Sequence, residues 1–152
     1  MKKLKLLLAA VSLMVITSCG KDNDDILSTD AQVKELKLLL QDGNWKISNF
    51  VKNQEDLTAY YSDIVFSFEN NNVLKAVSAG NEIPGTWRIS NDTGNDVDSY
   101  FDVDFNLFFN DDSKLKELRN DYSVISANSE KINLEIGENP LGNTVSLSFS
   151  KN

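Results

Sequence analysis

The chain has 152 residues, of which 41% are hydrophobic and 25% are charged, and its formal net charge is −8. Because it contains no histidine, histidine-based catalytic triads and imidazole-ligated metal sites are excluded. The acidic balance predicts repulsion of nucleic acid and of anionic lipid, so neither is expected as a direct partner.

Residues 1–18 have the pattern of a secretory signal peptide. A basic start at Lys2, Lys3 and Lys5 is followed by an uncharged, mostly apolar run over residues 6–16. This run is shorter than the roughly 20 residues that a transmembrane helix needs, and it matches the apolar centre of a signal peptide. We therefore expect residues 1–18 to be removed during export.

Cys19 is the single cysteine of the chain. The sequence Ile16-Thr17-Ser18-Cys19 resembles the lipobox of bacterial lipoproteins, in which the cysteine becomes the first mature residue and its sulfur carries a diacylglycerol. The alternative is an ordinary secreted protein with a free cysteine near its mature start. Acylation would anchor the protein stably in a membrane, and it would exclude both a disulfide and a cysteine nucleophile.

Residues 19–28 read as an acidic, solvated tether between the anchor and a folded domain, because they offer little to bury. The run Lys21, Asp22, Asp24 and Asp25 also resembles the export signal that sends lipoproteins of the Bacteroidetes group to the outer face of the outer membrane. Cell-surface display and a periplasm-facing anchor both remain open. Contact with the membrane is expected only through the lipid on Cys19.

Residues 29–152 are expected to form one folded domain. Ser28, Thr29 and Asp30 offer helix-capping oxygens, and helical spacing of apolar residues follows up to Gly43. From Asn44 onward the apolar period is two, which is typical of strands. The predicted strands lie near residues 44–52, 63–69, 73–79, 85–91, 100–109, 121–127, 131–137 and 144–150. Short helical pieces are predicted at residues 57–62 and 113–119.

Alternation within these segments predicts which side chains face the core. In the first strand, Trp45, Ile47 and Val51 are expected to point inward. The clearest strand places five apolar residues on one face, namely Phe101, Val103, Phe105, Leu107 and Phe109. Short connections favour antiparallel neighbours, and eight such strands close economically into a barrel. The predicted fold is mainly β: an eight-stranded antiparallel up-and-down barrel with an N-terminal helix.

Two segments of the chain are similar to each other: "GNWKISN" at residues 43–49 and "GTWRISN" at residues 85–91. We expect each glycine to let the chain turn tightly into a strand. Each tryptophan, Trp45 and Trp87, is expected to cap an end of the core with its large ring.

Gly43-Asn44-Trp45 resembles the G-x-W signature of lipocalins, and residues 38–149 look like the lipocalin-like domains of small Bacteroidetes lipoproteins. The resemblance implies a barrel whose lumen holds a hydrophobic or small ligand. The residues that would line it are Trp45, Phe66, Phe68, Trp87, Phe101 and Phe105. Lipocalins usually stack a late-strand arginine on the first tryptophan. Here the final strand offers Lys151, while the arginines are Arg88 and Arg119.

The acidic residues do not form a recognisable catalytic or metal motif. Asp92-Thr93-Gly94 has the letters of an aspartic protease site, but its polar neighbours favour a turn. The spacing of Asp92, Asp96 and Asp98, and of Asp111 and Asp112, misses the pattern of an EF-hand. Asp102 and Asp104 share one strand face and do not straddle a substrate as a glycosidase pair does. We expect no enzyme, no cofactor and no metal site.

Two functions therefore remain open. The first is a lipid-anchored outer-membrane protein that holds a small apolar or amphipathic ligand in a barrel lumen. The alternative is a non-enzymatic structural or interaction lipoprotein, whose barrel is filled by side chains and contacts another component of the cell envelope. The volume of the lumen separates the two, because a ligand needs a cavity of roughly 300 Å³ or more.

Overall fold

The computed structural model describes residues 29–91, 103–110, 114–137 and 143–152. One helix, α1 (Thr29–Gln41), precedes the strands. The strands are β1 (Asn44–Lys52), β2 (Glu55–Asp56), β3 (Val65–Phe68), β4 (Val73–Ser78), β5 (Asn81–Asn91), β6 (Val103–Phe109), β7 (Asn120–Ala127), β8 (Lys131–Ile136) and β9 (Val145–Lys151). Short 3-10 helices lie at η1 (Thr58–Tyr61), η2 (Asn70–Asn72) and η3 (Lys114–Leu118). Two of them, η1 and η3, confirm the predicted helical pieces.

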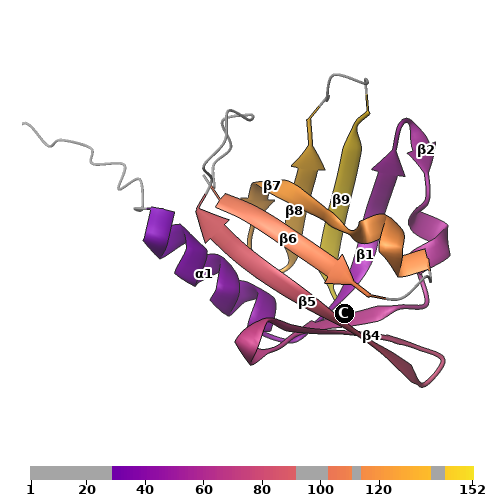
Figure 1. Ribbon diagram of the computed structural model, residues 1–152, viewed down its shortest axis with the longest axis horizontal. Coiled ribbons are helices and arrows are strands. Elements are labelled where there is room, and N and C mark those ends of the chain that lie inside the picture. Colours follow the sequence, from indigo (N-terminus) through magenta and orange to yellow (C-terminus); the bar gives the residue numbers. More distant parts are fainter. Residues whose placement is uncertain (1–28, 92–102, 111–113, 138–142) are drawn as a thin grey trace, which may run out of the picture.

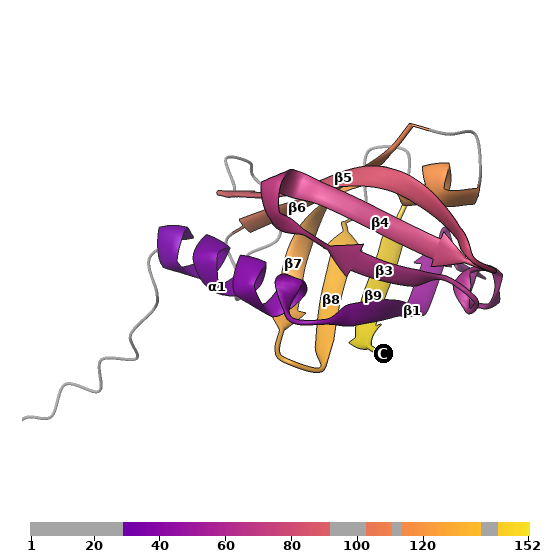
Figure 2. The ribbon, with the colours of Figure 1, turned by 90° about the horizontal axis from the view of Figure 1, so that it is seen from below.

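The strands form a closed antiparallel barrel, as predicted. Neighbours in space follow the order β1-β3-β4-β5-β6-β7-β8-β9, and β9 pairs again with β1 to close the ring. The two-residue strand β2 pairs only with the end of β1, through Val51 with Asp56 and Lys52 with Glu55, so it lies outside the ring. Figures 1 and 2 show the ring of strands from two directions. Closure leaves only short sheet edges exposed, which is how small barrels avoid edge-to-edge association.

Alternating apolar side chains fill the centre of the barrel. On β6 the residues Val103, Phe105, Leu107 and Phe109 are buried, while their neighbours face outward. The same period holds on β3, β4 and β8. On β9, Ser148 is buried as well as its neighbours Leu147 and Phe149. This half-buried pattern is the reason that these segments form strands, because one face of each strand packs in the core and the other is solvated.

The first strand departs from the predicted alternation. Trp45 and Ile47 are buried as expected, but Phe50 takes the next inward position instead of Val51. The register between β1 and β9 shifts between Ile47 and Asn49. Such a bulge inserts one extra residue, so every later side chain changes face. The assignment of Val51 to the core was therefore wrong.

The two glycines of the repeated segment do different things. Gly43 has φ +104°, so it makes the tight turn between α1 and β1 that the sequence predicts. Gly85 lies inside β5, which begins at Asn81, and pairs there with Leu74 and Phe109. A β-carbon on Gly85 would lie 2.7 Å from the carbonyl oxygen of Phe108. The predicted turn at Gly85 was wrong, and the close approach of two strands explains this glycine.

Helical elements cover both ends of the barrel. α1 lies along one end, with Leu36 and Leu40 fully buried, and it contacts β3, β5 and β6 (Figures 1 and 2). At the opposite end, η1 and η3 bring Tyr61, Leu115 and Leu118 into the core. In the described part of the chain, no helix is long and apolar enough to cross a membrane.

Candidate functional site: the barrel interior and its η1–η3 end

The structure brings together most of the residues predicted to line a lumen. Phe66 and Phe68 point inward from β3, Trp87 from β5 and Phe105 from β6, each at most 2% exposed. Trp45 is fully buried at the start of β1. Phe101 lies outside the described residues, as do Cys19 and the predicted signal peptide and tether.

These rings pack directly on one another. The Phe68 ring lies 5.6 Å from the Trp87 ring, 5.7 Å from the Phe105 ring and 5.6 Å from the Phe149 ring, measured between centroids. Phe66 contacts Phe149 at 5.4 Å. Most of these contacts are edge-to-face, the geometry that aromatic pairs favour. We call Phe66, Phe68, Trp87, Phe105 and Phe149 the aromatic cluster. It occupies the space between the strands that carry it.

Sequence reasoning did not assign Phe149 to this site, although it contacts three members of the aromatic cluster. Phe149 lies on β9, the last strand of the barrel. Its alternation with Leu147 and Val145 was the available signal.

Both indole nitrogens bond to the main chain. Trp45 Nε1 donates to the carbonyl oxygen of Leu40 at 2.8 Å, in the last turn of α1. Trp87 Nε1 donates to the carbonyl oxygen of Glu69 at 3.0 Å, just after β3. Asn70, the next residue, accepts a hydrogen bond from Gln41 of α1, so both tryptophans lie towards the α1 end. Buried indoles usually find such a partner, and here it ties the barrel to its cover.

Lys151 does not replace the stacked arginine of lipocalins. It pairs in register with Trp45, but its ammonium group donates to the Asp42 carboxylate at 2.7 Å. Among the described residues, the two cation–π contacts place Lys114 over Tyr61 and Arg119 over Phe108.

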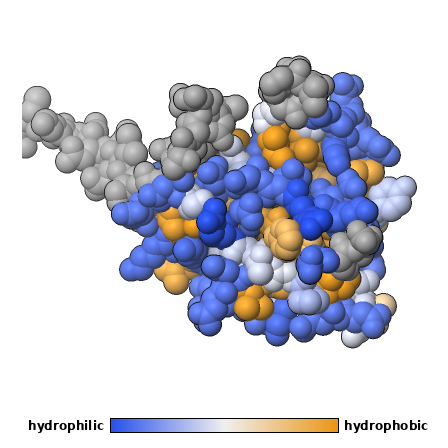
Figure 3. Space-filling model, in the orientation of Figure 1, coloured by the Kyte–Doolittle hydropathy of each residue, from blue (hydrophilic) through white to orange (hydrophobic). Residues whose placement is uncertain are grey.

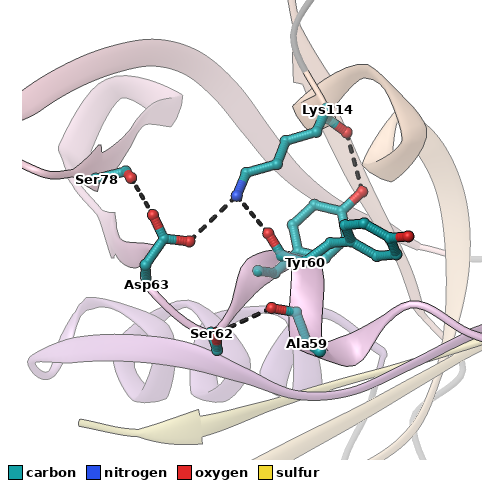
Figure 4. Close-up of polar contacts among 7 residues, drawn as sticks. Ala59, Tyr60, Ser62, Asp63, Ser78 and Lys114 are labelled. Atoms are coloured by element: carbon teal, nitrogen blue, oxygen red, sulfur yellow. Dashed lines mark hydrogen bonds and ion pairs between the residues drawn. The ribbon is translucent and has the colours of Figure 1, made fainter.

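A polar network at the η1–η3 end joins three distant segments (Figure 4). The Lys114 ammonium donates to Asp63 Oδ1 at 3.1 Å and to the carbonyl oxygen of Tyr60. The Ser78 hydroxyl donates to Asp63 Oδ2. The Tyr61 hydroxyl donates to the carbonyl oxygen of Lys114 at 2.9 Å. The network fastens η1 and η3 to each other and to the end of β4.

The chemistry of this network favours a structural role. The hydroxyl of Ser78, and then the ammonium of Lys114, donate to Asp63 and lower the pKa of its carboxyl group. A carboxylate with a lowered pKa is a weak base, so it would not activate the Ser78 hydroxyl as a nucleophile. The arrangement therefore holds two 3-10 helices in place.

Beside this network the surface is hollowed, with a volume of about 350 Å³. The lining of this η3 hollow includes Lys52, Asn53, Lys116, Glu117, Arg119 and Asn120. It lies where β1 ends and where η3 leads into β7. The Lys52 ammonium pairs with the Glu117 carboxylate, which lowers the pKa of that carboxyl group.

The acidic residues of the described part do not gather into a metal site. No group of three aspartate, glutamate, histidine or cysteine side chains lies close enough there to hold an ion. Asp104 faces outward on β6, opposite Ser123 of β7. The other aspartates considered above, Asp92, Asp96, Asp98, Asp102, Asp111 and Asp112, lie outside the described residues, together with Asp92-Thr93-Gly94.

Comparison with known proteins returned no matching family model and no matching curated protein. The fold and the geometry of the site therefore carry the functional argument.

Proposed function

We propose that this chain is a non-enzymatic interaction protein of the bacterial envelope. An acyl group on Cys19 holds it at the outer membrane, displayed on the cell surface. Its barrel is filled by its own side chains, and its outer surface contacts another component of the envelope. Of the two functions that the sequence leaves open, this is the one that the interior packing favours.

One observation carries the proposal: the Phe68 ring touches Trp87, Phe105 and Phe149 at centroid distances of 5.6–5.7 Å. A ligand lumen in an eight-stranded barrel requires that inward side chains leave space between them. Here large rings from four strands meet, and both indole nitrogens already have main-chain partners. We therefore interpret the barrel interior as a protein core, and we assign contact with another envelope component to the outer surface.

The outer surface supports this assignment. On the face in Figure 3, hydrophilic side chains dominate and hydrophobic areas are small and separated. A surface of this kind suits reversible contact through polar groups more than permanent apolar association.

The anchor and the packed interior are tested separately. The full chain is produced in a Gram-negative bacterium, with a Cys19→Ala variant as the matched control. Fatty-acid labelling should mark the parent chain and not the variant, and protease added to intact cells should digest the parent. A parent chain that takes up no label would contradict the anchor. Labelled chain that resists protease would favour the periplasm-facing alternative.

For the interior, the mass of the Cys19→Ala chain is recorded under native and denaturing conditions. Equal masses are expected for a packed barrel. A native mass that exceeds the denatured mass by an amount on the order of a few hundred daltons, the size of a typical pocket ligand, would contradict the proposal. It would favour the ligand-binding function instead.

A further inference from the structure

The described residues that line the η3 hollow include more cationic than acidic side chains. Three cationic side chains, Lys52, Lys116 and Arg119, line it together with one carboxylate, Glu117, which pairs with Lys52. The whole chain has a formal charge of −8. A local positive site in an acidic protein concentrates anions at one place while the rest of the surface repels them.

Arg119 is held in a geometry that suits carboxylate recognition. Its guanidinium carbon lies 4.6 Å from the centroid of the Phe108 ring. A contact of this kind restrains the guanidinium group, and Arg119 is exposed, so that the edges of the group can fit a carboxylate with two parallel hydrogen bonds. Among the described residues, the guanidinium donates no hydrogen bond to another side chain or to the main chain.

Exposed apolar side chains continue the surface beyond Arg119. Phe108 is 43% exposed on β6 and lies opposite Thr86 of β5, which lies opposite Val73 of β4. Val73 is 38% exposed. Arginine and aromatic residues are enriched at the energetic centres of protein interfaces. The polar hollow therefore adjoins, at Arg119, an exposed strip made of Phe108, Thr86 and Val73.

We propose that an acidic segment of a partner protein binds here, with one of its carboxylates held by Arg119. Its neighbouring apolar atoms would lie on Phe108. A free small anion would use only the open, polar hollow and would bury little surface there, whereas a polypeptide adds contacts along the strip. This inference rests on the proposed function and names the chemistry of the partner.

The test uses the full chain and a fluorescent hexaglutamate peptide, with binding followed by fluorescence anisotropy at an ionic strength of about 0.02 M. We expect Arg119→Gln to weaken binding about 10-fold or more, the effect of losing a paired charge. Arg119→Lys, which keeps the charge and loses the planar fork, should also weaken binding. The matched control, Lys131→Gln, removes one exposed charge at the α1 end and should change affinity less than about twofold. Circular dichroism verifies that each variant is folded.

Three outcomes would overturn the inference. The first is an absence of peptide binding by the parent chain, and the second is an equal loss with Lys131→Gln, the sign of general electrostatic attraction. The third is an Arg119-dependent response to inorganic phosphate, or to vesicles containing phosphatidylglycerol, that exceeds the response to the peptide. A lumen ligand found by native mass would instead contradict the proposed function, and it would not depend on Arg119.

Discussion

The indole nitrogen of Trp45 donates a hydrogen bond of 2.8 Å to the backbone carbonyl of Leu40. This bond joins the first strand of the barrel to the last turn of α1, across the turn made by Gly43. The carbonyls of a helix end lack partners within the helix, so a buried end needs such a donor. The interaction explains why a tryptophan follows the turn so closely.

Replacement of this indole should destabilise the fold. We expect Trp45→Phe to lower the free energy of unfolding by roughly 2–3 kcal/mol, because it removes ring volume and leaves a buried carbonyl without its donor. Trp87→Phe is the matched comparison, since its acceptor, the Glu69 carbonyl, is only partly buried and can bond to water. Urea denaturation measures both. An equal loss in the two variants would contradict the role given to the buried helix end.

The aromatic cluster predicts a contrast between two phenylalanines of the same strand. Phe105→Ala should cost about 3–5 kcal/mol of unfolding free energy, because it opens a cavity among packed rings. Phe108→Ala, at an exposed position, should cost less than about 1 kcal/mol. Chemical denaturation of both variants gives the two values. A small loss for Phe105→Ala would mean that Phe105 borders an existing space, which would favour a lumen.

Two glycines provide a test of close strand approach. Gly85→Ala should lower stability by roughly 2–3 kcal/mol, because the new β-carbon meets main-chain and ring atoms at 2.7 Å. Gly80→Ala should cost about 1 kcal/mol, since φ is +81° there but no atom lies within 4 Å of the added carbon. Thermal unfolding ranks the variants. A greater loss at Gly80 would show that backbone conformation outweighs crowding.

Stability should fall in alkali. Burial, and then the negative charge of Glu117, raise the pKa of Tyr61 to about 12, and burial also raises the pKa of Tyr122. The unfolded chain loses these protons near pH 10, so rising pH favours unfolding. The stabilising effect is complete below about pH 10 and is lost progressively as pH rises towards 12.

Urea denaturation over this pH range gives the slope, and absorbance near 295 nm follows ionisation of the tyrosines. The double variant Tyr61→Phe, Tyr122→Phe distinguishes the contribution of these two tyrosines to the pH dependence from that of the lysines. The stability of this variant should fall less steeply with pH than that of the parent chain. An identical slope in the parent and the double variant would assign the alkaline loss to other groups.

Much of the barrel could be predicted because apolar and polar residues alternate along each strand, which shows the side that is buried and the side that is solvated. The run from Val103 to Phe109 alternates so regularly that one side had to be buried, and short connections left few topologies. The bulge in β1 was not visible in this way. It depends on how β1 pairs with β9, about a hundred residues away, so no local pattern distinguishes Phe50 from Val51 as the inward residue.

The sequence by itself determined most of the elements, their order, the closed barrel and the residues of the aromatic cluster on β3, β5 and β6, because apolar and polar side chains alternate along a half-buried strand. The short elements β2 and η2 were not predicted. Only the tertiary structure decided that these rings pack on one another, since a lined cavity and a filled core have the same alternation. It alone assembled the η3 hollow, because three residues that line it, Lys52, Arg119 and Val145, lie on segments that meet only when the barrel closes.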